Sequence, residues 1–91
     1  MAQFWESGTP TVLTGSGAVS LAPGTLLGFY VASTTGGTVV VLNGTTAAGT
    51  AISGTITPAA GTFHRFPAFC TSGCYLTLAN TINLTAFFAA G

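Results

Sequence analysis

The sequence predicts an all-β domain, an antiparallel β-sandwich or jelly roll of seven to eight short strands that follows an N-terminal arm. Two observations lead to this prediction. No segment places apolar residues at helical spacing with polar residues on the opposite side. Short runs of β-branched and aromatic residues recur instead, and each run ends at Gly, Pro, Asn or Ser. Runs spaced by about ten residues are typical of antiparallel sandwiches and jelly rolls.

We expect seven strands, and the first can be broken in two at residues 15–17. Their ranges are 11–21, 25–33, 38–42, 51–56, 62–66, 75–78 and 82–88. Turns are expected at residues 34–37, at Asn43-Gly44, at 58–61 and at Ser72-Gly73. Asn-Gly is the pair that primed hairpin turns prefer, because both central residues then have positive φ.

The apolar pattern predicts which strands have one buried face. Apolar and polar residues alternate clearly in residues 75–78 and 82–85, as expected for a half-buried strand. They do not alternate in residues 26–31, which favours a strand buried on both faces. A second subunit could cover one of those faces.

The chain has 91 residues, which is enough for one core and one domain. We expect residues 1–10 to form an N-terminal arm and residues 11–91 a single β-sandwich domain. The arm carries Phe4, Trp5 and Glu6, followed by a Ser-Gly-Thr-Pro break. Large aromatic side chains in an arm have no core of their own, so the arm is expected to attach to a neighbouring protein surface. The alternative is that the arm folds back onto its own domain.

Charge is almost absent. Hydrophobic residues make up 48% of the chain but charged residues only 2%, and the net charge is +0. A typical globular domain has about 25% charged residues. Glu6 is the only acidic side chain, and Arg65 is the only Lys or Arg. Such a chain has little electrostatic protection against self-association, so we expect a homo-oligomer, with a trimer favoured.

This composition also excludes several function classes. Acid–base catalysis by paired carboxylates needs two Asp or Glu, and no Gly-x-Ser-x-Gly nucleophile motif is present, so we expect no enzyme activity and no cofactor. A metal site would lack ligands. Binding to nucleic acid needs several cations to neutralise phosphates. The densest apolar run, residues 26–32, is far shorter than the roughly 20 residues of a spanning helix, so no membrane partner is expected.

Cys70 and Cys74 are separated by three residues and leave two alternatives open. In the first, they are two small apolar side chains across a tight turn. In the second, they form a hairpin disulfide in an oxidising medium. Closing so short a loop would add little stability.

Polar and aromatic side chains coincide only in residues 63–69. One interpretation is alternating core Phe residues with His64 and Arg65 near an edge. A second is a protein interface, where aromatic residues and Arg are enriched. A third is a sugar-binding platform, but residues 63–69 lack the Asp, Glu or Asn side chains that usually surround the aromatic residue of a carbohydrate site. The candidate interface residues, together with the arm, are Phe4, Trp5, Phe63, His64, Arg65, Phe66 and Phe69.

Residues 24–78 contain, in order, a leucine-rich strand, a Gly-Gly-Thr strand, an Asn-Gly turn, Pro-x-x-Gly and an aromatic-Pro pair. This layout resembles small β-sandwich virion proteins of tailed bacteriophages. The resemblance implies a capsid decoration (cement) protein, or a related head or tail accessory, that packs as an oligomer on the major capsid protein. It implies a place in the virion. The first residues lack the basic and apolar regions of a signal peptide, so synthesis in the host cytoplasm is expected. The alternative function is a receptor- or glycan-binding head of a fibre or tail.

Overall fold

The computed structural model describes residues 9–90 and confirms the antiparallel all-β prediction. Six strands form one hydrogen-bonded sheet, with no helix among the described residues. They are β1 (Thr9–Leu13), β2 (Gly17–Ser20), β3 (Gly24–Asn43), β4 (Thr50–Ala51), β5 (Thr62–Cys70) and β6 (Cys74–Ala90). The predicted arm, with Phe4 and Trp5, lies outside the described residues except for Thr9 and Pro10, which belong to β1.

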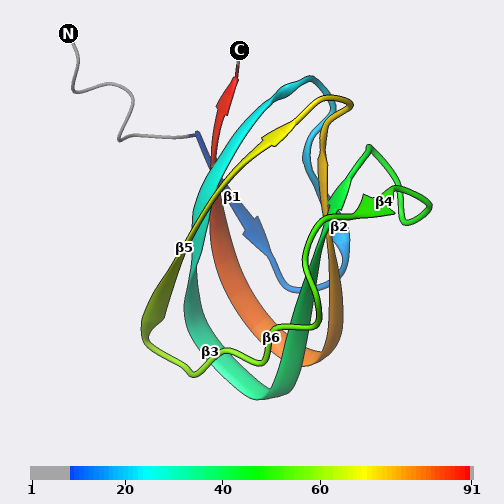
Figure 1. The fold of residues 1–91 in the computed structure, drawn as a ribbon. Helices are drawn as coiled ribbons and strands as arrows, with labels where there is room; N and C mark the ends of the chain where they lie inside the picture. The colour runs from blue at the N-terminus through cyan, green and yellow to red at the C-terminus, as the bar shows by residue number, and fades with distance from the viewer. Residues whose placement is uncertain (1–8, 91) are drawn as a thin grey trace, which may run out of the picture.

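The two long strands, β3 and β6, are paired with each other along nearly their whole length. Both bend, so the sheet has two halves that face each other (Figure 1). The first half contains β5, the start of β3, the end of β6 and β1, in that order. The second half contains β4, the end of β3, the start of β6 and β2.

The core lies between the two halves. Its side chains come mainly from alternate positions of β3 and β6, because successive residues of a strand point to opposite faces. The fully buried large residues are Phe29, Leu26, Leu76, Leu84, Val31, Val39, Val41, Cys70 and Cys74.

The bend replaces one turn that the sequence predicts, and it lies within strands that were expected to be separate. The turn predicted at residues 34–37 is a bend within β3, and the predicted strands 75–78 and 82–88 are one strand, β6. Gly36 and Asn80 have φ values of 66° and 62°, which extended backbone does not adopt. The Asn80 side chain donates from Nδ2 to the carbonyl oxygen of Gly36 at 2.8 Å. Thr34 Oγ1 accepts from the Gly37 N–H at 2.9 Å and donates to the carbonyl oxygen of Thr81 at 3.3 Å. These bonds hold the two strands together where they bend.

A β-bulge explains why residues 26–31 do not alternate. The pairing register of β3 shifts between Leu26 and Gly28, so one extra residue separates the inward-facing Leu26 from Phe29. Alternation then continues with Tyr30, which is 42% exposed, and Val31, which is fully buried. The expectation of a strand buried on both faces is therefore wrong within this chain.

Other boundaries differ in detail. The predicted break at residues 15–17 separates β1 from β2. Of the predicted strand 51–56, only Ala51 lies in β4, although Ile56 makes two backbone hydrogen bonds of 2.8 Å with Val39. Asn43 does not begin a two-residue hairpin, because its strand partner is Thr50. Its side chain instead accepts from the Ser72 N–H and donates to Thr71, both at 3.0 Å, and so fixes the turn between β5 and β6.

We predict that Gly37→Ala destabilises the fold through the bend. An added Cβ would lie 2.6 Å from the Cβ of Ile82 and 2.9 Å from the carbonyl oxygen of Thr81. Overpacking of this kind costs about 1–3 kcal/mol. Gly54→Ala is the matched control, because nothing lies within 4 Å of its added Cβ. Urea unfolding followed by far-UV circular dichroism should show a lower midpoint for Gly37→Ala alone; equal midpoints for the two variants would contradict the steric explanation.

Candidate interaction face on the first half-sheet

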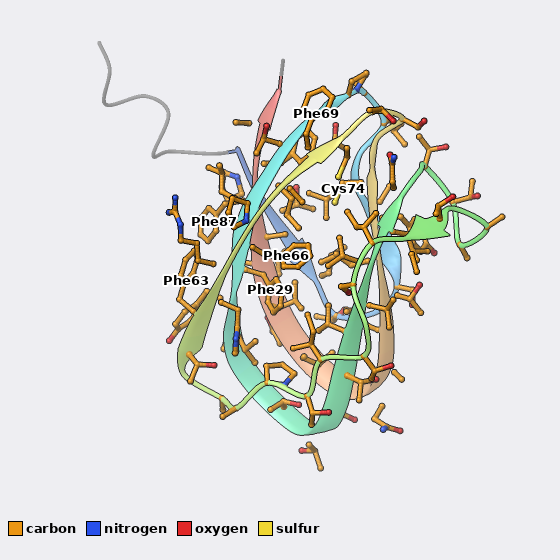
Figure 2. All side chains as sticks on the ribbon, in the orientation of Figure 1. Phe29, Phe63, Phe66, Phe69, Cys74 and Phe87 are labelled. Atoms are coloured by element: carbon orange, nitrogen blue, oxygen red, sulfur yellow. The ribbon has the colours of Figure 1, made fainter. Side chains whose placement is uncertain are left out.

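Strand β5 divides the predicted interface residues between two faces. Phe63, Arg65 and Phe69 alternate with His64 and Phe66, and the burial of the strand alternates in the same way. Phe63 and Phe69 are 52% and 57% exposed. Phe66 packs against the core. Figure 2 shows Phe29 and Phe66 between the two halves of the sheet, whereas Phe63 and Phe87 lie outside them.

Neighbouring strands extend the exposed side of β5 into a continuous face. Tyr30 of β3 pairs with Phe63, and Val12 of β1, which is 63% exposed, lies on the far side of β6. The Phe63 ring contacts that of Phe87, with centroids 6.0 Å apart and planes inclined by 56°. We call this the outer face; its residues are Pro10, Val12, Tyr30, Phe63, Arg65, Pro67, Phe69 and Phe87.

Gly28 lets the aromatic side chains of the outer face meet. It lies in β3 between Arg65 of β5 and Phe87 of β6. A Cβ at this position would collide with the carbonyl oxygen of His64 and would lie 2.9 Å from the Phe63 ring. Because Gly has no side chain, the Phe63 ring can lie over β3 and reach Phe87.

Pro67 is compatible with its position in β5. Proline cannot donate a hydrogen bond, so within sheets it is found on edge strands. Among the described residues, β5 pairs only with β3. The outer face therefore extends to an edge of the first half-sheet.

His64 has a structural position on the inner side of β5. Its ring stacks on Phe29, with centroids 5.3 Å apart and planes inclined by 28°. Thr62 Oγ1 donates its only proton to the carbonyl oxygen of Ala59, at 2.5 Å. It therefore accepts the 2.9 Å hydrogen bond from His64, which places a proton on Nε2. His64 and Phe66 thus help to hold β5 on the core, and an interface on the outer face would not use them.

The outer face contains residues that the sequence interpretation missed. Tyr30, Val12 and Phe87 come from three different strands, and only the pairing of these strands places them beside β5. One signal was available for Phe87. Two adjacent aromatic residues in a strand must point to opposite faces, and Phe88 is buried.

Cys70 and Cys74 lie on the inner side, at the end of β5 and the start of β6. Both are fully buried, and both are free thiols in the structure. Burial raises the pKa of the Cys70 thiol. Burial, together with the adjacent Cys70 sulfur, raises the pKa of Cys74 from 9.0 to about 12. Because the thiolate is the nucleophilic form, these thiols are poorly suited to catalysis.

Within residues 9–90, no group of three or more His, Cys, Asp or Glu side chains could hold a metal ion. The same residues contain no helix long and apolar enough to span a membrane. Comparison of the chain with protein-family models, curated proteins and solved structures gave no match.

We predict that the buried thiols make the fold less stable in alkali. The folded chain favours the neutral thiol, so this contribution to stability is complete below pH 9.0 and is lost as the pH rises toward about 12. The free energy of unfolding should fall by up to about 1.4 kcal/mol per pH unit for each thiol. Urea unfolding at about pH 8, 9.5 and 11 measures this slope. Cys74→Ala should have a shallower slope than the wild type, and the same slope in both would contradict the assignment.

Proposed function

We propose that this chain is a non-catalytic structural protein that packs against other protein surfaces through its outer face. The supporting observation is the exposure of Phe63, Phe69, Tyr30 and Val12 on one side of one half-sheet. Exposed apolar patches of several hundred Å² mark interaction sites on soluble proteins. Aromatic residues with one Arg among them are also the composition of binding hot spots.

The near absence of charge supports the same proposal. Arg65 is the only Lys or Arg in the chain and lies on the outer face. Ordinary surfaces are kept soluble by interspersed charges of both signs. A surface without them, carrying several exposed aromatic side chains, is stable when a second surface covers it.

The setting that we propose is the virion of a tailed bacteriophage, with the chain as a capsid decoration (cement) protein on the head. The resemblance of residues 24–78 to small β-sandwich virion proteins supports this setting. The partners are then further copies of the chain, with a trimer favoured, and the major capsid protein. Apolar contacts of the outer face would stabilise the capsid shell without any catalysed reaction.

A receptor- or glycan-binding head of a fibre is the second candidate. The Tyr30 and Phe63 side chains, paired across β3 and β5, favour it, because sugar rings stack on exposed aromatic side chains. The number of copies separates the two functions. A decoration protein is present in hundreds of copies per particle and a fibre head in a few, so a stained gel of the source particle distinguishes them.

We predict that Phe63→Ser combined with Phe69→Ser prevents assembly and leaves the fold intact. Both side chains are more than half exposed, so the core loses little. Removing aromatic anchors from an interface commonly costs about 2 kcal/mol or more for each residue. Light scattering should report a smaller species, with an unchanged circular dichroism spectrum. Leu21→Ser is the control, because Leu21 is 75% exposed but belongs to none of the strands of the outer face. Normal assembly of the double variant would contradict the proposal.

We also predict that association is nearly insensitive to salt. With one cationic and one acidic side chain per copy, few ion pairs can form at any contact. Apolar burial, at about 25 cal/mol per Å² before association costs, must then supply most of the affinity. Raising sodium chloride from about 0.05 M to about 1 M should change the dissociation constant by less than about tenfold. A larger loss would indicate that a charged partner surface dominates.

A further inference from the structure

Arg65 limits what can cover the outer face. It lies on β5 between Phe63 and Phe69, the two exposed aromatic residues of that strand. A guanidinium that is removed from water without a partner loses its hydration and gains nothing in return. An apolar partner surface would therefore have to bring a carboxylate or another acceptor to Arg65.

The only carboxylate side chain of this protein stands in the sequence Phe4-Trp5-Glu6. Two aromatic residues followed by an acid are complementary to a face that presents aromatic residues around one Arg. We propose that residues 1–8 of a second copy of this chain bind the outer face, with Glu6 paired to Arg65 and with Trp5 and Phe4 packed on Phe63 and its neighbours Tyr30 and Phe87. This inference rests on the proposed function and names the segment that occupies the face.

The strand pairing sets the path that the segment of the same copy would have to take. Pro10, Phe87, Gly28 and Arg65 form one row across β1, β6, β3 and β5. Three strand spacings separate the Cα atoms of Pro10 and Arg65, which is about 14 Å. The four residues from Pro10 back to Glu6 span about 13–14 Å when fully extended. The side chains of Glu6 and Arg65 add to this reach, so a Glu6–Arg65 pair within one copy is the alternative that a monomer with a buried Trp5 would reveal.

The charge on Arg65 argues against two outer faces packed directly on each other. A two-fold axis close to Arg65 would bring two Arg65 side chains together without a carboxylate from either face. Like charges in that arrangement are destabilising. The segment of a second copy supplies the missing carboxylate, and its reach is not set by the distance from Pro10 to Arg65 within one copy.

Trp5 is the only Trp in the chain, so its fluorescence reports this contact without a label. We expect the emission of the full-length protein to shift to the blue as the concentration rises, in step with the mass measured by light scattering. Glu6→Arg and Arg65→Glu should each weaken self-association by at least about tenfold. The chain with both substitutions restores opposite charges and should associate within about threefold of the wild type. Leu21→Ser, at an exposed position outside the strands of the outer face, is the control that leaves this face unchanged.

Four results would contradict the inference. A blue-shifted Trp5 in a monomer at every dilution would mean that the segment covers its own face. An oligomer in which Trp5 remains solvent-exposed would mean that another surface mediates assembly, and the proposed function would stand without this inference. Failure of the double substitution to restore association in an oligomer that each single substitution weakens would exclude the Glu6–Arg65 pair. A chain that remains monomeric at all concentrations, with Trp5 exposed, would count against the inference and against self-assembly.

Discussion

The fold depends on the pairing of β3 with β6 through the point where both strands bend. Each strand belongs to both halves of the sheet, so the bend brings two apolar faces together and creates the core between them. The backbone at the bend adopts positive φ at Gly36 and Asn80, and the Asn80 side chain bonds across to Gly36. Asparagine tolerates this conformation better than most residues, which reduces the strain. Without the bend, the 20-residue β3 paired with β6 would be a twisted ribbon with one apolar side in water.

The same geometry creates the outer face. A strand has two sides, and the core uses only one of them. In the first half-sheet, the outward positions of β5 carry Phe63, Arg65, Pro67 and Phe69. The inward positions of β5 anchor it to the core through Phe66 and through His64, which stacks on Phe29. The aromatic side chains of the outer face are therefore presented on a strand held from behind, and a rigid presentation of this kind reduces the entropy lost when a partner binds.

Local patterns predicted the strand-rich class but not the connections. Val39 to Leu42 and the alternation in residues 75–78 lie in strands, because these patterns are set by burial of one face. In a sequence, a pair of glycines or an asparagine is as typical of a bend within a strand as of a turn between two strands. The hydrogen bond that accompanies the bend here joins Asn80 to Gly36, 44 residues away in the sequence, so a local pattern could not predict it. The candidate interface residues show the same limit. In a strand, residues 63, 65 and 69 point to one face and residues 64 and 66 to the other. The sequence could therefore separate the two sets, but it could not show which face packs on the core. Tyr30 and Phe87 join the face only through strand register, which is not local.

Hydroxyl and amide groups take the structural role that ion pairs have in other domains. Ser16 Oγ donates to the carbonyl oxygen of Leu78 and accepts from its N–H, and so joins the connection after β1 to β6. Asn43 and Thr34 likewise donate and accept at the same time. Among the described residues, no buried side-chain nitrogen or oxygen lacks a hydrogen-bond partner. Neutral groups that both donate and accept can connect segments distant in the sequence without the desolvation cost of a charge. A chain built in this way needs no ion pair for the described part of its fold.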